Sequence, residues 1–323
     1  MPSRRSARRR WALPAAAPWA TWAVLRATGS ERGFPLIPAL SFTPYAAASA
    51  VLPFALAVHA RSRAAALVAA GSGAVLAGAV LVPARRRPPA CPPPSGARLR
   101  VATVSLRRGL VAPGPVLELV RRHDVDVLAV QELTPRAEAA LRAAGIHTLL
   151  PHGHVLAARP GQVLSASGAV WTRVPVTGRG EVPGEFEQPT VRLAGSTAPA
   201  VEVTSVHTFP PATSPASVRR WARDLASLPA PAPDLLRVLA GDFNATFDHA
   251  ALRAVLGLGY DDAARAAGKG LAWTWRPLRL RFPRLVLDHV LVDPRITIAS
   301  VDVVPVSGSD HRAVVAELVL PGG

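Results

Sequence analysis

The sequence predicts an α/β domain that follows an apolar helical region, and three observations carry this prediction. From residue 99 onward, strand-like and helix-like segments alternate along the chain. The strand-like runs, such as residues 125–130, are continuously apolar, which is typical of strands that are covered on both faces. Before Gly96, three apolar segments with flanking arginines replace this alternation. We therefore expect two regions of different character.

Charge is divided unevenly between these regions. Residues 1–96 carry 12 Arg and one Glu, whereas residues 97–323 carry 25 Lys and Arg against 20 Asp and Glu. Most of the net charge, +11 of +16, therefore belongs to the first third of the chain. A nucleic-acid footprint is expected on the domain that does the chemistry, but these arginines flank apolar stretches, as charges that anchor a protein in a bilayer do. The distribution favours a lipid bilayer as partner of the N-terminal region.

The three apolar segments span residues 11–27, 39–58 and 64–82. The third has no charged residue and is long enough to cross a hydrocarbon core of about 30 Å. The first is interrupted by Pro14 and Pro18, so that an interfacial segment or a cleaved signal peptide is an alternative for it. We expect residues 1–84 to form a membrane anchor with three transmembrane helices.

The side of the membrane depends on the number of spans. The strongest early basic cluster precedes the first segment and favours an N-terminus inside the cell. Three spans then predict a multi-pass protein of the cell membrane with an extracytoplasmic catalytic domain, and two spans would reverse that side. Residues 85–97, rich in Pro and Arg, are expected to form a linker, either a stiff spacer or one without defined length. The single cysteine, Cys91, lies there, so no disulfide framework is expected.

The catalytic domain is expected to span residues 98–323. Residues 99–106 alternate like a strand, and residues 116–122 have helical apolar spacing before the buried strand 125–130. A helix at 136–144 is expected to end at Gly145. Further strands are expected at 168–172, 190–193 and 201–206, and a helix at 215–228. Strand-like runs at 235–240, 285–287 and 301–306 lead to acidic motifs.

Four short acidic motifs follow strand-like runs. They are Gln131-Glu132, Gly241-Asp242-Phe243-Asn244, Leu287-Asp288-His289-Val290 and Gly308-Ser309-Asp310-His311. Side chains from separate strands would converge at one edge of a sheet. Phosphodiester hydrolysis needs a cation, a positioned water and donors aimed at the phosphate. Because hard oxygen ligands select Mg²⁺ or Mn²⁺ over zinc, the motifs predict a metal-dependent phosphoesterase site.

Particular residues suit particular roles in such a site. Glu132 ends its strand and is the best candidate metal ligand, with Asp310 as a second contributor. Asp242 and Asn244 are two residues apart, so on an extended segment they project to the same side. That placement suits the orientation of a water and the binding of a phosphate oxygen together. The alternative is a turn-forming Asp-x-Asn sequence after a strand.

Together with Ser205-Val206-His207, these motifs resemble the endonuclease/exonuclease/phosphatase superfamily, in order and with family-like spacing, over residues 99–320. The resemblance implies the family's four-layer sandwich of two packed mixed β-sheets and outer helices. The apolar N-terminal segments and the bias to Ala and Arg indicate a membrane-anchored bacterial member. It implies that Asp242 holds or activates the attacking water and that Asn244 contacts the phosphate. Asp288 and His311 resemble the family's carboxylate and histidine dyad. His207 lies where the family presents a His or Tyr to the scissile phosphate.

The sequence leaves open the role of His311 and the consequence of Ser105. The sequence does not decide whether His311 acts as base or as phosphate ligand. The family's first strand ends with an Asn near the metal, whereas this chain has Ser105 there, which predicts weakened activity. The rival hypothesis is a binding module that holds a phosphorylated ligand without turning it over. His289 neighbours Asp288 on the opposite strand face and is expected to pack or support.

The substrate is the least determined part of the prediction. Arginines alternate with apolar residues before Asp288, and this pattern fits an anionic groove, anionic lipid headgroups or merely a solvated basic loop. The residues concerned are Arg276, Arg279, Arg281 and Arg284, with Trp273, Trp275 and Phe282. A nuclease and a phospholipid or head-group phosphodiesterase are therefore close competitors. The expected partner is a phosphate-ester substrate, and the sequence does not predict an oligomeric state.

Overall fold

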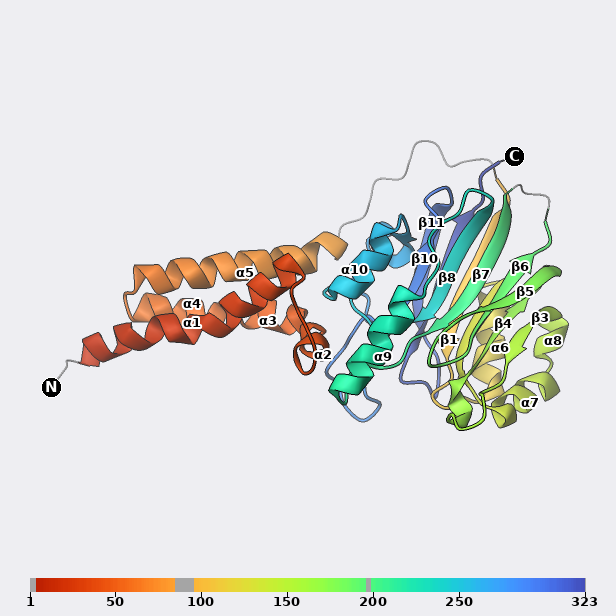
Figure 1. Ribbon diagram of the computed structural model, residues 1–323, viewed down its shortest axis with the longest axis horizontal. Coiled ribbons are helices and arrows are strands. Elements are labelled where there is room, and N and C mark those ends of the chain that lie inside the picture. Colours follow the sequence, from red (N-terminus) through yellow and green to blue (C-terminus); the bar gives the residue numbers. More distant parts are fainter. Residues whose placement is uncertain (1–3, 85–95, 196–198, 323) are drawn as a thin grey trace.

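Two six-stranded mixed sheets pack face to face in the computed structural model, which describes residues 4–84, 96–195 and 199–322 (Figure 1). Nearly all of the expected linker, residues 85–95, lies outside the described residues. The first sheet has the order β11-β12-β1-β2-β4-β3. Its strands are β1 (Arg98–Ser105), β2 (Val127–Leu133), β3 (His152–Leu156), β4 (Ser167–Thr172), β11 (Thr297–Pro305) and β12 (Arg312–Val319). The expected fold class is confirmed.

The second sheet has the order β5-β6-β7-β8-β10-β9. Its strands are β5 (Val176–Val182), β6 (Gln188–Leu193), β7 (Ala200–His207), β8 (Leu235–Asp242), β9 (Asp261–Asp262) and β10 (Asp288–Val292). Each sheet has one parallel pair near its centre, β1 with β2 and β7 with β8. These strands are almost wholly buried, which explains their continuous apolar sequences.

Helices cover the outer face of each sheet and complete four layers (Figure 1). The first sheet packs against α6 (Pro113–Arg122), α7 (Pro135–Ala143) and α8 (Ile146–Leu149), and the second against α9 (Pro215–Ala226) and α10 (Ala250–Gly257). Two short elements, η1 (Leu164–Ala166) and α11 (Ala263–Ala266), complete the domain. The core between the sheets consists of small and branched side chains such as Val101, Val203 and Val238, which let the two sheets approach closely.

Strand register brings the ends of several strands to one edge. The parallel pairs align Ser105 with Gln131 and His207 with Asp242. The antiparallel pair of β8 and β10 places Asp288 directly opposite Asp242. The run at 285–287, expected as a strand, instead leads into β10, which begins at Asp288 itself. The acidic motifs therefore gather where the strands end.

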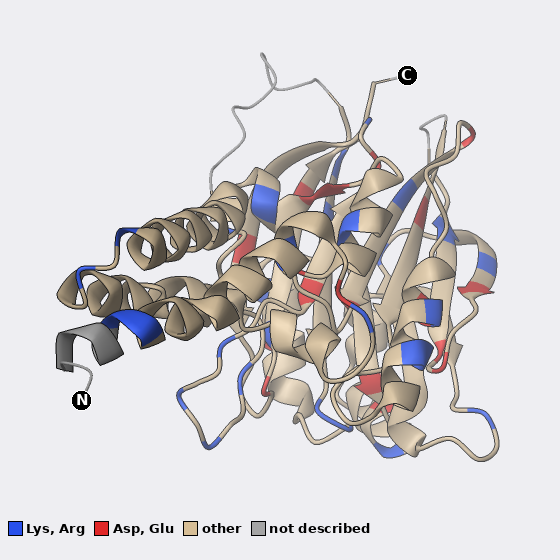
Figure 2. Ribbon diagram, turned by 60° about the vertical axis from the view of Figure 1, so that its left-hand side comes forward, with Lys and Arg blue, Asp and Glu red and all other residues tan. Residues whose placement is uncertain are grey.

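The N-terminal region is helical throughout its main segments. It comprises α1 (Arg4–Thr28), α2 (Leu36–Leu40), α3 (Thr43–Ser49), α4 (Val51–His59) and α5 (Arg63–Ala84). Helices α1, α3 and α4 pack along α5, with Ala12, Ala57 and Ala65 buried between them. Figure 2 shows Lys and Arg gathered at the ends of these helices rather than along them.

Three membrane spans were expected, and the described residues support one. Helix α5 is the one described helix long and apolar enough to cross a membrane. The apolar helical stretch Thr43–His59 is too short, and α1 begins with a run of arginines. The multi-pass arrangement is therefore not supported by the length and composition of the helices.

The N-terminal helices also contact the α/β domain directly. Arg26 at the end of α1 pairs with Asp248, and Glu31 accepts a hydrogen bond from the backbone N–H of Ala250 at the start of α10. The ring of His249 bonds the carbonyl of Ile37 in α2 at 2.9 Å. These polar contacts fix the helices against the loop that follows Asn244.

Candidate active site

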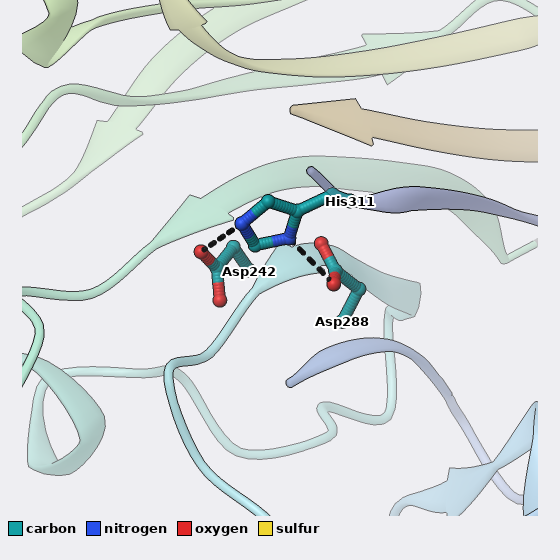
Figure 3. A group of neighbouring side chains, drawn as sticks. All are labelled: Asp242, Asp288 and His311. Atoms are coloured by element: carbon teal, nitrogen blue, oxygen red, sulfur yellow. Dashed lines mark hydrogen bonds and ion pairs between the residues drawn. The ribbon is translucent and has the colours of Figure 1, made fainter. Parts of the chain in front are cut away.

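His311 lies between two buried carboxylates at the convergent strand ends (Figure 3). Its Nδ1 donates to Asp288 Oδ2 at 2.9 Å, and its Nε2 faces Asp242 Oδ2 at 3.8 Å. Asp242 ends β8, Asp288 begins β10 and His311 directly precedes β12, so three strands from both sheets supply the group. Gly241 permits the close approach of β7 to β8, because a Cβ there would lie 1.9 Å from the carbonyl oxygen of Val206.

The two carboxylates hold His311 in its charged form. Burial opposes the imidazolium, but the negative charges of Asp288 and Asp242 outweigh it and raise the pKa of His311 to about 10. Burial raises the pKa of Asp242 to about 7, with the charge of His311 opposing and that of Asp288 adding to the rise. The site therefore combines a cationic hydrogen-bond donor with a carboxylate that can accept a proton near neutral pH.

Glu132 reaches the same region through an unusual backbone conformation. Its φ is 55°, in the left-handed region, and the pairing of β2 with β4 shifts register between Val130 and Leu133. The carboxylate accepts a hydrogen bond from the backbone N–H of Arg108. Burial raises the pKa of Glu132, and the charges of His311 and Asp310 also act on it. The carboxylate of Glu132 is therefore within electrostatic reach of the His311 group.

Asp242 and Asn244 lie on a turn, and the expectation of an extended segment is wrong. Asn244 has a φ of 45°, and its backbone N–H donates to Asp242 Oδ1 at 2.8 Å. The side-chain amide of Asn244 donates to the carbonyl of Thr208 at 2.9 Å and approaches Asp242 Oδ2 at 3.3 Å. An Asp side chain that bonds the backbone two residues on is a usual turn device. The turn nevertheless brings the two side chains together.

His207 is buried at the end of β7, beside Asp242 in the strand register. Its ring packs on Phe186 with 4.5 Å between the ring centres, and its Nδ1 has no hydrogen-bond partner in the described chain. Burial and the charge of His311 lower the pKa of His207 to about 3. His207 is therefore neutral, unlike His311, and can offer a hydrogen bond without adding charge.

Asp310 adjoins this group from the loop before β12. Its carboxylate accepts a hydrogen bond from Trp275 Nε1 at 3.3 Å, and its negative charge helps to raise the pKa of His311. Ser309 donates its hydroxyl to the carbonyl of Ser105 at 2.8 Å and thereby ties this loop to the end of β1. All seven sequence-predicted residues thus lie at one edge of the sandwich.

The donor atoms of this edge suit a hard cation. Asp242 and Asp288 each offer one carboxylate oxygen, and these atoms lie within 4.8 Å of each other and of a ring nitrogen of His311, which is itself no metal ligand while it keeps its proton. Within the described chain, the buried Ser105 Oγ and Asp288 Oδ1 have no hydrogen-bond partner. Buried oxygen atoms without a protein partner require a water or a cation. Because Glu132 and Asp310 add two more carboxylates, the donor set fits a divalent metal with oxygen ligands.

Two supporting residues were not expected as site residues: Thr274 lies outside the motifs, and Gln131 belongs to one of them but was given no role. The hydroxyl of Thr274 accepts hydrogen bonds from the backbone N–H groups of Leu287 and Asp288, at 2.9 and 3.0 Å, and so fixes the start of β10. Gln131 donates to Ser205 at 2.9 Å and links β2 to β7 across the two sheets. By contrast, His289 bonds Asp262 and the carbonyl of Ala245, so it supports the packing of the second sheet rather than the site.

A sandwich of two mixed sheets that gathers carboxylates and a histidine at one edge defines a hydrolase fold of the phosphoesterase type. Residues 106–311 match the family model for the endonuclease/exonuclease/phosphatase family, which covers more than half of the chain. The chain belongs to this family. No curated protein matches it in sequence.

Solved structures show the same fold at low sequence identity. A humanized D. rerio TDP2 is 14% identical with a TM-score of 0.55, covering 68% of this chain and 98% of its own. An endonuclease/exonuclease/phosphatase from Beutenbergia cavernae is 21% identical with a TM-score of 0.53, covering 70% and 72%. D. rerio TDP2 complexed with single strand DNA product is 14% identical with a TM-score of 0.53, covering 69% and 99%.

Proposed function

We propose that this protein hydrolyses phosphate esters, phosphodiesters or phosphomonoesters, by metal-assisted attack of water. The observation that carries the proposal is the placement of His311 between Asp288 and Asp242, with Glu132 nearby. This arrangement joins a fixed cationic donor, a proton acceptor and a cluster of oxygen ligands at one edge. Phosphoryl transfer requires these three components.

The protonation states assign the roles. Because His311 keeps its proton, we assign it as a donor to a phosphoryl oxygen rather than as the base, with Asp288 orienting its ring. Asp242 is the candidate base, since burial raises its pKa to about 7 and it can take a proton from the attacking water. Asn244, bonded to Asp242, and the neutral His207 are the residues that would contact the phosphate.

Glu132 and Asp310 would hold Mg²⁺ or Mn²⁺. When bound, the ion would neutralise negative charge on the phosphoryl oxygens. Ser105, with its unpartnered hydroxyl, would bond a water of the ion's hydration shell. The short side chain of Ser105 favours a slow enzyme over a fast one. Ser105 also supports a second candidate function, that of a binding module which holds a phosphorylated ligand without turnover.

We further propose that α5 tethers the protein to a membrane, with the α/β domain outside the cytoplasm. The support is the length and apolar composition of α5 and the arginines at the helix ends (Figure 2). A membrane location makes phospholipid head groups available as substrates. The DNA product bound by the D. rerio TDP2 neighbour favours nucleic acid instead. Both remain substrate classes of the proposed enzyme.

The test is hydrolysis by the full chain in detergent, because the N-terminal helices contact the loop after Asn244. Substrates are bis-p-nitrophenyl phosphate, DNA, RNA and phospholipid vesicles, each with Mg²⁺, Mn²⁺ or EDTA. We expect metal-dependent turnover that His311→Ala abolishes in protein that still folds, with a lower melting temperature because two buried carboxylates lose their cation. Turnover that survives in folded His311→Ala would reject the mechanism. Inactivity on every substrate would favour the binding module.

A further inference from the structure

A basic cavity opens beside His311. It has a volume of about 560 Å³, and its wall includes Asp310 and His311 at the catalytic end. The remainder of the wall is dominated by arginines around one tryptophan. These residues are Arg276, Arg281, Arg284, Arg312 and Trp273. The cavity is therefore continuous with the proposed catalytic site. Its arginines are positively charged, whereas the catalytic site is rich in carboxylates.

Trp273 gathers three of these cations around its ring. The guanidinium carbon of Arg312 lies 3.5 Å from the ring centre, and those of Arg284 and Arg276 lie at 5.2 and 5.6 Å. Each distance is within the range of a cation–π interaction. Because Arg312 covers a ring face so closely, that face cannot stack on a nucleobase. The tryptophan positions positive charge instead.

These arginines have no acidic partners among the described residues. In the parts of the chain that the structure describes, no carboxylate forms an ion pair with Arg276, Arg281, Arg284 or Arg312. Arg312 Nε is buried without a hydrogen-bond partner, and Arg276 donates to the carbonyl of Leu280. The guanidinium groups of Arg276, Arg284 and Arg312 gather around one ring and therefore repel one another. A bound anion would relieve this repulsion and supply the missing acceptor.

The N-terminal region contacts the segment 276–284, which carries three of the cavity's arginines. The hydroxyl of Tyr45 in α3 accepts a hydrogen bond from the backbone N–H of Arg284 at 2.6 Å and donates to its carbonyl at 3.3 Å. The ring of Tyr45 meets Phe282 edge to face, with 6.4 Å between centres. The hydrogen bonds with Tyr45 therefore fix the backbone of Arg284, and this fixed backbone positions the guanidinium group at the cavity.

We propose that this cavity is a second anion subsite, which binds a phosphate group of the substrate next to the phosphate that is hydrolysed. The proposal rests on the proposed function for the position of the scissile phosphate. One guanidinium group can donate hydrogen bonds to two oxygens of a phosphate. Several arginines without carboxylate partners among the described residues therefore suit the binding of one further phosphate in this cavity. The preferred substrates are therefore phosphate esters that carry a second phosphate.

Binding tests the subsite without catalysis. Titration calorimetry of the full chain in detergent would measure the affinity for inorganic phosphate in EDTA, so that no metal contributes. We expect about tenfold weaker binding in both Arg276→Ala and Arg284→Ala, equivalent to about 1.4 kcal/mol. The matched control is Arg279→Ala, because Arg279 is exposed in the same segment but does not line the cavity. Equal affinity in folded Arg284→Ala and the wild type would overturn the proposal.

Matched substrates test the same subsite during turnover. Thymidine 5′-(p-nitrophenyl phosphate) is compared with the same compound that carries a 3′-phosphate. We expect about tenfold higher kcat/KM for the 3′-phosphorylated substrate, and a ratio near one in the Arg276→Ala and Arg284→Ala variants. Phosphatidylglycerol vesicles with and without phosphatidylglycerol phosphate extend the comparison to a lipid source.

The outcomes separate the two proposals. If the wild type hydrolyses neither thymidine substrate, the proposed function fails for them, whereas the calorimetry still decides whether the anion subsite exists. If the wild type hydrolyses both at equal kcat/KM, the subsite is overturned and the proposed function stands. Equal loss of phosphate affinity in Arg279→Ala would show general charge attraction in place of a defined subsite.

Discussion

Arg26 and Asp248 form an ion pair between the N-terminal helices and the α/β domain, with 2.5 Å between Nε and Oδ1. The side chains are only 13% and 9% exposed, so the pair is largely shielded from water. Arg253 reinforces it by donating to the carbonyls of Asp248 and Arg26. The contact lies in the loop that begins after Asn244. The helices are therefore a packed part of the fold as well as a proposed anchor.

Removal of one partner of this pair should destabilise the whole chain. Arg26→Ala leaves Asp248 buried without its cation, and breaking a buried pair in this way costs about 3–5 kcal/mol. We expect a clear fall in the midpoint of denaturant unfolding in detergent. The control is Arg32→Ala, because Arg32 is exposed. A midpoint in Arg26→Ala equal to that of the control would contradict the buried contact.

Stability should fall in acid through His249. Its Nδ1 accepts from the backbone N–H of Thr246 at 2.9 Å, so its Nε2 carries the proton donated to Ile37, and the ring is neutral. Burial lowers the pKa of His249 to about 4, below its ordinary 6.5. Between pH 4 and pH 6.5, His249 therefore binds a proton more readily in the unfolded chain than in the folded protein. The contribution of neutral His249 to the free energy of unfolding is fully present above pH 6.5. It falls by roughly 3 kcal/mol as the pH falls towards 4.

The variant His249→Gln isolates this effect. His207 also has a lowered pKa and contributes in the same direction, so the wild-type pH dependence alone does not assign it. Unfolding free energies of the wild type and the variant are measured from pH 7 to pH 4. We expect the difference between the two proteins to shrink as the pH falls. A constant difference would mean that His249 does not titrate in this range.

The backbone at Glu132 should favour glycine. With a φ of 55°, any side chain there is strained relative to glycine by about 1–2 kcal/mol. Glu132→Gly and Glu132→Ala both remove the carboxylate, so their comparison isolates the backbone term. We expect both to lose metal-dependent turnover, and the glycine variant to be more stable by about 1 kcal/mol. Equal melting of the two would show that the left-handed conformation relaxes in the variants.

Ser105 should limit the rate. Its hydroxyl is buried with no hydrogen-bond partner among the described residues, at the end of β1, where the family resemblance implies an asparagine. Ser105→Asn restores an amide that can bond the water shell of a metal, and we expect higher metal-dependent kcat. Ser105→Ala is the control, and it should be slower than the wild type but equally stable. An inactive parent that gains nothing from asparagine would support the binding module.

The fold was predictable because its determinants are local or periodic. The apolar runs that became β2, β7 and β8 are buried on both faces, and such strands leave an unbroken pattern in the sequence. Two edge strands, β3 and β5, were missed for the converse reason, whereas the edge strand β11 was expected from the run at 301–306. β3 contains three polar or glycine positions in its five residues, and the exposed face of β5 breaks any apolar run. Tertiary pairing, rather than local preference, makes them strands.

The candidate site was predictable in membership but not in geometry. The motifs identify which residues meet, because each lies at a strand terminus: Asp242 ends β8, Asp288 begins β10 and His311 precedes β12. The turn at Asn244 was ambiguous, since Asp-x-Asn suits both a turn and an extended segment. Thr274 could not be assigned, because its role depends on hydrogen bonds to Leu287 and Asp288 that only the folded chain forms. The contact of Tyr45 with Arg284 joins residues 239 positions apart and has no local signature.

The left-handed backbone of Glu132 has a consequence for attempts to engineer this protein. A library screened for heat resistance alone would enrich glycine at position 132 and discard the carboxylate together with the strain. The proposed metal ligand persists only where selection rewards turnover. We therefore expect selection for turnover, rather than for stability, to keep a carboxylate in this conformation.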